Sequence, residues 1–217
     1  EAGIISRAVV AAKVNGNVVA LTTPISEDAD VELLTFADED GRHVFRHTAS
    51  HILAQAVKRL YPEAKLAIGP AIDKGFYYDF DVPKAFSPEE LEKIEAEMKK
   101  IVKEGLELTQ FEMTPDEAIK FYEEQGEIYK VELIKEHADK GENISFYKQG
   151  EFTEHSEQAT CSNFSFSKSS TIVMRDATTI SVTTGNTGML SFDLYSNQKG
   201  SAAETAIQSP LNTGFLT

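Results

Sequence analysis

The sequence predicts an α+β protein, in which helices and sheets of antiparallel or mixed strands pack in two layers. Two observations carry this prediction. Two amphipathic helices with clear start and stop signals lie among short strand-like runs, and these elements lack the regular strand–helix–strand rhythm of a parallel sheet. Hydrophobic residues make up 41% of the 217 residues, so the chain can bury a packed core.

A small β-rich unit is expected first. Apolar and polar residues alternate along residues 8–21, and the Asn-Gly pair at 15–16 is a strong hairpin signal within this run. Residues 31–36 form a further strand, which we expect the Asp-Gly pair at 40–41 to close. At roughly 36 residues, the unit is too short to fold securely alone.

Capping signals predict two helices. The first begins after Ser87 and ends at Gly105, and the second begins after Thr114 and ends at Gly126. In each, a proline follows the cap residue and a glutamate stands three residues after it, as in a capping box. The first helix carries apolar side chains at three- and four-residue spacing: Leu91, Ile94, Met98, Ile101 and Val102.

Residues 154–217 differ in amino-acid composition from the rest of the chain. They hold 21 Ser or Thr and only 8 charged residues among 64, and we expect this tail to be either disordered or strand-forming. Its strand-prone runs are residues 172–174 and 178–184. Strand candidates before the tail are residues 65–68, 76–80, 106–113 and 144–148.

Charge and cysteine content narrow the class of protein. The chain has 21 basic and 35 acidic residues and a net charge of −14, which argues against binding nucleic acid by bulk charge. A single cysteine excludes an intramolecular disulfide and favours a reducing compartment. No apolar stretch reaches the ~18–20 residues that span a bilayer, and no leader is evident. We expect a cytoplasmic protein with no membrane partner.

Two histidines four residues apart are the most pointed chemical feature. His47 and His51 lie in a helix-compatible run over residues 46–57, where positions four apart share a face. Converging imidazoles suit a metal ion, or a pair of groups that position and deprotonate water. The plainer alternative is a polar helix end with two half-exposed histidines. No glutamate follows His47, which excludes the HExxH metalloprotease pattern.

A zinc site built on this pair is the less favoured alternative, and we expect no cofactor. Zinc needs further ligands, and the candidates show no recognised ligand spacing: His43, His137, His155 and Cys161. The glycine loops of nucleotide-binding sites and the GxSxG elbow of serine hydrolases are also absent.

Two other places hold polar side chains of interest. Residues 65–81 predict a strand, a tight turn and a strand. Tyr77 and Tyr78 alternate sides of the second strand, so one hydroxyl can face a cleft while the other ring packs. Lys130 is an ordinary surface lysine by its local context.

Several segments, in order, resemble bacterial threonyl-tRNA synthetases: residues 47–57, 60–62, 65–70, 75–81, 129–134 and 144–153. The matching part of that family is its N-terminal editing domain, which the resemblance assigns to residues 37–153. Residues 1–36 are similar to the second half of the ubiquitin-like, β-grasp domain that precedes it. Residues 154–217 match neither.

The resemblance implies an activity and its residues. Editing domains of this family hydrolyse serine esterified to threonine tRNA, because one missing methyl discriminates by only about 1–3 kcal/mol. His47 and His51 would position or activate the attacking water, Lys130 would hold or polarise the ester, and Tyr78 would contact the terminal adenosine or the seryl group. The implied partner is the tRNA acceptor end. Family members are homodimers, and whether this fragment is monomeric stays open.

The chain departs from the family after residue 153. The family continues with an aspartate and a Cys-Arg-Gly-Pro-His segment, whereas Glu154 stands at the aspartate position here, where it is the candidate substrate-binding residue. Ser156 and Thr160 stand at the cysteine and histidine positions, and no likeness to the aminoacylation core follows. Two readings therefore stay open: an aminoacyl-ester hydrolase, or an inactive fragment that at most binds tRNA weakly.

Overall fold

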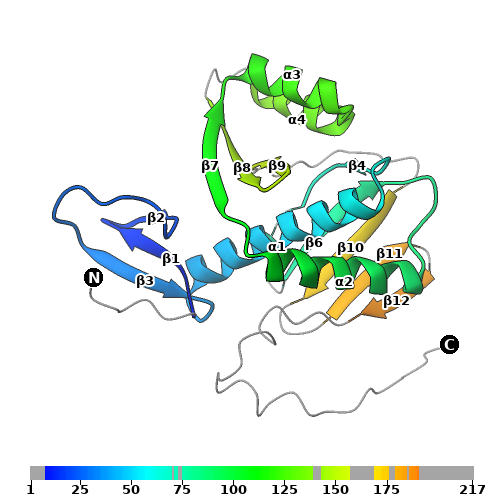
Figure 1. Cartoon of the computed structure of the whole chain (residues 1–217), viewed down its shortest axis with the longest axis horizontal. Coiled ribbons are helices and arrows are strands. Elements are labelled where there is room, and N and C mark those ends of the chain that lie inside the picture. The colour runs from blue at the N-terminus through cyan, green and yellow to red at the C-terminus, as the bar shows by residue number, and fades with distance from the viewer. Residues whose placement is uncertain are drawn as a thin grey trace, which may run out of the picture.

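The computed structural model describes residues 8–69, 71–72, 75–138, 143–156, 169–175, 179–184 and 186–190. In these residues four helices accompany three sheets, and every strand pairing is antiparallel, so the predicted α+β class is confirmed. Figure 1 shows a small sheet at the N-terminal side, a central sheet behind two helices, and a third sheet with its own helix pair.

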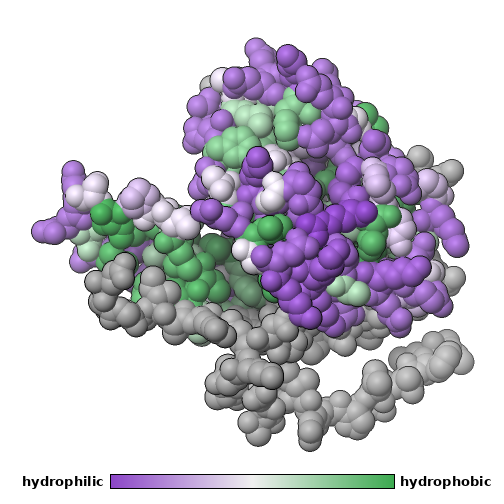
Figure 2. All heavy atoms as spheres, in the orientation of Figure 1, coloured by the Kyte–Doolittle hydropathy of each residue, from purple (hydrophilic) through white to green (hydrophobic). Residues whose placement is uncertain are grey.

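The first sheet has the order β2-β1-β3, formed by β1 (Val9–Val14), β2 (Asn17–Val19) and β3 (Val31–Thr35). Asn15 and Gly16 make the predicted hairpin turn with φ angles of 49° and 85°. One face packs on the start of α1, where Lys13 pairs with Asp40. Figure 2 shows hydrophobic surface on this unit, whose exposed apolar side chains are Val18, Leu21, Ile25 and Val31.

Helix α1 (Glu39–Leu60) begins earlier than expected. The prediction that the Asp-Gly pair at 40–41 closes a strand was wrong, because both residues lie in the first turn of this helix. The Asp38 carboxylate instead accepts the backbone N–H of Thr35 at 2.7 Å and ends the strand. A Cβ on Gly41 would lie 2.0 Å from the Thr35 carbonyl oxygen, so glycine permits this close approach.

The central sheet has the order β12-β11-β10-β6-β4, and β5 also pairs with β6. Its strands are β4 (Lys65–Leu66), β5 (Ala71–Ile72), β6 (Gly75–Asp81), β10 (Ser169–Arg175), β11 (Thr179–Thr184) and β12 (Asn186–Leu190). Helices α1 and α2 (Pro88–Glu104) pack together over this sheet (Figure 1). The main core lies between them and includes Leu53, Phe80, Met98 and Ile172. Three of these strands, β10, β11 and β12, come from residues 154–217.

Both predicted capped helices are confirmed. Ser87 and Glu90 form a reciprocal capping box at the start of α2, and Thr114 and Glu117 form another at the start of α3 (Pro115–Gln125). The C-cap glycines adopt the left-handed conformation, with φ of 60° and 68°. Figure 2 shows that hydrophilic residues dominate the visible surface of these helices, in keeping with the net charge of −14.

The third sheet joins β7 (Leu108–Met113), β8 (Ile144–Gln149) and β9 (Phe152–His155) in that order. Helices α3 and α4 (Ile128–Ala138) cover it through a second apolar cluster that includes Tyr122, Ile134 and Phe146. Strand β9 runs through Glu154 and His155, beyond residue 153, where the predicted family likeness ends. The β8–β9 hairpin points toward α1 (Figure 1).

Candidate active site

The two histidines of α1 converge as their spacing predicts. The ring centroids of His47 and His51 lie 4.4 Å apart, and both rings make edge contacts with Tyr147 of β8, at 5.8 and 5.9 Å. His51 is only 3% exposed, so the alternative of two half-exposed rings does not describe it. The Ser50 hydroxyl donates to the His47 carbonyl at 2.8 Å within the same turn.

Burial keeps both imidazoles neutral. It lowers the pKa of His47 to about 4, an effect that His43, His155 and Lys130 reinforce and that Glu154 opposes. Burial, together with His47 and Lys130, also holds the pKa of His51 well below its ordinary value. A neutral imidazole at pH 7 can accept a proton from water.

One ring nitrogen of the pair has no hydrogen bond to a described residue. Nε2 of His47 is buried and has no hydrogen-bond partner among the described residues. Buried polar atoms normally have a partner, so an unpaired one indicates a place for water or substrate. Nε2 of His47 is therefore the atom of the pair that could accept a hydrogen bond from a water or a substrate group.

Lys130 departs from its sequence-based interpretation as a surface lysine, because it is buried, with 3% exposure. Its Nζ lies 2.5 Å from Oε1 of Glu154 and 5.5 Å from the centroid of the Tyr78 ring. Ile134, which is also buried, follows Lys130 by four residues, so the two side chains project from the same side of α4. Packing of α4 against the rest of the protein, which the local sequence does not reveal, turns it inward.

Glu154 links Lys130 to Tyr78. The Tyr78 hydroxyl donates to Oε2 of Glu154 at 2.8 Å, and the tyrosine is 2% exposed. Burial, and then the Glu154 charge, raise the pKa of Tyr78 well above its ordinary value, so the phenol remains a donor. Oε1 has no well-aligned hydrogen bond, but the Lys130 ammonium faces it as an ion pair. Both oxygens of a buried carboxylate are thus engaged.

Two further residues belong to this cluster: Tyr122, which was not singled out from the sequence, and His155, which was considered from the sequence only as a metal ligand. His155 is 5% exposed, and its Nδ1 lies 3.1 Å from the Tyr122 hydroxyl, which also accepts the His155 backbone N–H at 3.0 Å. The same Nδ1 lies 3.6 Å from Oε1 of Glu154. Tyr122 follows Ala118 by four residues in the capped helix α3, and this shared helix face was the available signal.

The remaining candidate positions lie outside this cluster or outside the described residues. Ser156 donates its backbone N–H to the Ser145 carbonyl at 2.7 Å, at the end of the hairpin. Thr160 and Cys161 fall among residues that the structure does not describe. Within the described ranges no three His, Cys, Asp or Glu side chains are grouped to hold a metal ion.

These groups have chemical properties that suit acid–base steps on a bound substrate. A neutral imidazole with a free nitrogen can take a proton from water, while an ammonium and a phenol offer positive charge and a hydrogen bond to a developing oxyanion.

In the described part of the chain, no helix is long and apolar enough to cross a membrane.

Comparison with known proteins bears on which substrate such a site would meet. No family model matches the chain. It is 63% identical over 145 residues to a threonine–tRNA ligase of Clostridium tetani, a match that covers 67% of this chain and 22% of that protein. The predicted resemblance is confirmed. Threonine–tRNA ligases of Acetivibrio thermocellus and Carboxydothermus hydrogenoformans are 61% and 59% identical, over 150 and 143 residues.

The matches cover only part of this chain and a smaller part of each relative. They cover 66–69% of this chain, and the chain spans less than a quarter of the length of the threonine–tRNA ligases. About two thirds of the sequence is therefore similar to an N-terminal fragment of a bacterial threonine–tRNA ligase.

Proposed function

We propose that residues 37–153, together with Glu154, form an editing domain of a threonine–tRNA ligase that hydrolyses serine wrongly esterified to threonine tRNA. The observation that carries this proposal is the neutral pair of the half-buried His47 and the buried His51, close to the Lys130–Glu154 ion pair. The names of the relatives support the identity of the tRNA. Residues 1–36 would be the remainder of a β-grasp domain.

The physical need for such an activity is plain. Serine differs from threonine by one methyl group, and a binding site can favour the larger amino acid by only about 1–3 kcal/mol on that difference. A second site that destroys the wrong ester removes the error that the first site cannot avoid.

The chemistry assigns one role to each group. His47, through its free Nε2, takes a proton from a water whose oxygen attacks the ester carbonyl carbon. Lys130 and the Tyr78 hydroxyl stabilise the negative charge that develops on the carbonyl oxygen. The bond between the carbonyl carbon and the ribose oxygen then breaks, and the imidazolium gives its proton to that departing oxygen, which leaves as the ribose hydroxyl. His51 holds the His47 ring, and Glu154 holds Lys130 and Tyr78.

The partner of this site would be the acceptor end of the tRNA. The net charge of −14 gives the chain little attraction for phosphates, so the affinity of this fragment for tRNA should be weak. The single cysteine supports a reducing compartment, and we therefore place the reaction in the cytoplasm.

A second candidate is an inactive fragment that binds tRNA weakly and does not hydrolyse the ester. One observation favours it: Glu154 engages both Lys130 and the Tyr78 hydroxyl, so neither is free to meet an ester until the carboxylate moves. Ser156 also stands where the family resemblance implies a cysteine.

Ester hydrolysis separates the two candidates. The purified chain is mixed with serine-charged threonine tRNA, and loss of the ester is followed beside a protein-free sample. If the chain is a hydrolase, it should accelerate loss of the seryl ester, and the His47→Ala, His51→Ala double variant should not. The His43→Ala variant is the matched control, because it removes an exposed imidazole from the same helix. Equal rates for the unchanged chain and the double variant would remove the hydrolase proposal.

A further inference from the structure

A polar stripe runs along α1. Its members recur every four residues: His47, His51, Gln55 and Arg59. The two histidines contact the ring of Tyr147, and the other two reach toward the end of the β8–β9 hairpin. The candidate catalytic rings and the groups that hold the hairpin therefore belong to one side of one helix.

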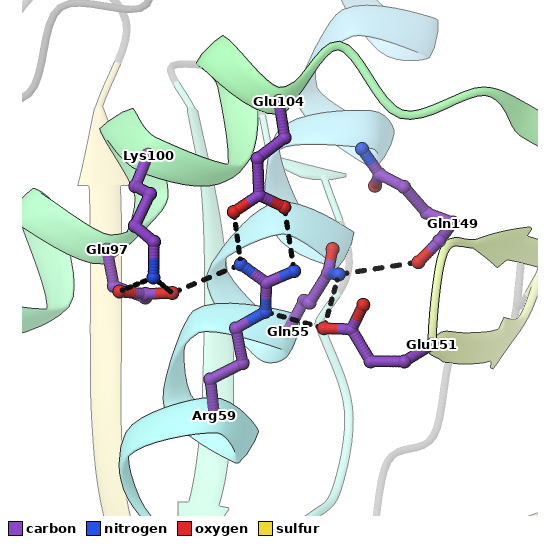
Figure 3. Close-up of polar contacts among 7 residues, drawn as sticks. All are labelled: Gln55, Arg59, Glu97, Lys100, Glu104, Gln149 and Glu151. Carbon is purple, nitrogen blue, oxygen red and sulfur yellow. Dashed lines mark hydrogen bonds and ion pairs between the residues drawn. The ribbon is translucent and has the colours of Figure 1, made fainter.

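Gln55 and Arg59 meet on a single carboxylate oxygen (Figure 3). Gln55 Nε2 donates to the Gln149 carbonyl at 3.3 Å and to Oε1 of Glu151 at 3.0 Å. Arg59 Nε donates to the same Oε1 at 2.5 Å. Glu151 lies in the turn between β8 and β9, three residues before Glu154. The contact thus joins α1 to the strand that carries Glu154.

The stripe meets the hairpin in both its strand and its turn. His47 and His51 contact the ring of Tyr147 in β8. Gln55 meets the Gln149 carbonyl at the end of β8, and Gln55 and Arg59 together hold the Glu151 carboxylate in the turn. The hairpin is therefore attached to α1 at more than one point along its length.

Arg59 is itself held from the opposite side. Its guanidinium donates to Oε1 of Glu97 at 3.1 Å and to both oxygens of Glu104 at 2.9 Å, and these two glutamates belong to α2. Arg59 and then Gln55 lower the pKa of Glu151 to about 2, so this carboxylate stays charged at all working pH values. Of these three glutamates, Glu151 is the member on the hairpin.

We propose that Gln55 and Arg59 are positioning residues which, by holding Glu151, fix the β8–β9 hairpin on α1 and so place Glu154 against Lys130 and beside the histidine pair. Tyr122 holds the other end of β9 through His155. The inference rests on the proposed function for its catalytic consequence, whereas the placement of the hairpin can be measured without it.

The kinetic test compares three variants of the full chain. Glu151→Ala removes the anchor and should lower kcat for seryl-ester hydrolysis about 10-fold or more with little change in KM, because small misplacements of catalytic groups are costly. Glu104→Ala is the matched control: it also takes a carboxylate from Arg59, but on the α2 side, and should stay within about twofold. Glu151→Gln should recover most of the rate, since its amide oxygen can accept both N–H groups.

The pKa of His47, measured by NMR titration, reports whether the hairpin still covers the ring, and this measurement does not depend on ester hydrolysis. In Glu151→Ala the pKa of His47 should rise from about 4 toward 6.5 as water reaches the ring, and in Glu104→Ala it should not move. Identical titrations for these two variants would overturn the inference. If the titrations differ as expected while the unchanged chain hydrolyses no ester, the proposed function fails and the positioning role stands.

Discussion

The Nζ atom of Lys130 lies 2.5 Å from Oε1 of Glu154, and both side chains are 3% exposed. A buried pair of this kind is costly to break, because removal of one partner leaves the other charge buried and uncompensated. The pair therefore ties α4 to β9 and fixes two of the groups on which the proposed chemistry depends.

Loss of Lys130 should destabilise the fold. Lys130→Met leaves the Glu154 charge unpaired, and we expect the free energy of unfolding to fall by about 3–5 kcal/mol in urea denaturation. Lys135→Met is the matched control on the same helix, because Lys135 is exposed and lies 3.8 Å from its partner Glu123. That change should stay within about 0.5 kcal/mol. Equal losses of unfolding free energy in the two variants would show that the buried Lys130–Glu154 pair matters no more to stability than an exposed pair.

Stability should fall as the pH is lowered from 6.5 to 4. The folded chain holds His47 neutral with a pKa of about 4, while the unfolded chain takes up a proton near pH 6.5. The unfolded state therefore binds more protons in this window, and the contribution of His47 to the unfolding free energy, about 3 kcal/mol, is lost as the pH falls through it. His51 acts in the same direction.

Urea midpoints measured at several pH values check this expectation. His47→Gln should flatten the pH dependence. His43→Gln should flatten it less, because it removes only one of the influences that lower the pKa of His47 and leaves the burial of that ring in place. A pH dependence that is as steep in His47→Gln as in the unchanged chain would contradict burial of a neutral ring.

The tail strand β10 should be part of the folded unit. Ile172 is 0% exposed and stands opposite Tyr78 in the register of β10 and β6. Ile172→Ala should cost about 2–5 kcal/mol, and Ile172→Val about 0.5–1.5 kcal/mol, in the free energy of unfolding. Limited proteolysis should leave β10 intact. Rapid removal of everything after residue 156, with no loss of stability, would show that the tail does not dock.

Binding of tRNA should be weak and should depend steeply on salt. With a net charge of −14, the chain relies on a few local basic groups to contact phosphates, and those contacts release counterions. Affinity for uncharged threonine tRNA, measured from about 50 to 200 mM salt, should fall markedly. The same affinity at both ends of this range would exclude a phosphate-based mode of binding.

Local signals in the sequence were sufficient for much of the fold. Proline, glutamate and glycine at fixed offsets defined α2 and α3, and the Asn-Gly pair defined the first hairpin. The four-residue spacing of His47 and His51 correctly placed both rings on one side of α1. These features depend on residues close in the chain, which is why a sequence alone reveals them.

The features that were missed depend on residues far apart. The burial of Lys130 requires Glu154, 24 residues later in the chain. The stripe residue Arg59 finds its partners on α2 and in the hairpin turn. His155 was considered only as a metal ligand in the tail, although pairing of β9 with β8 brings it to Tyr122. No local pattern encodes such contacts, because tertiary packing creates them.

Selective hydrolysis is the most direct test of the central claim. The chain is incubated in parallel with threonine tRNA charged with serine and with threonine, and the two ester-loss rates are compared after subtraction of protein-free controls. An editing site predicts that the serine ester is lost at least about 10-fold faster. Loss of both esters at the same rate, or of neither above the control, would contradict it.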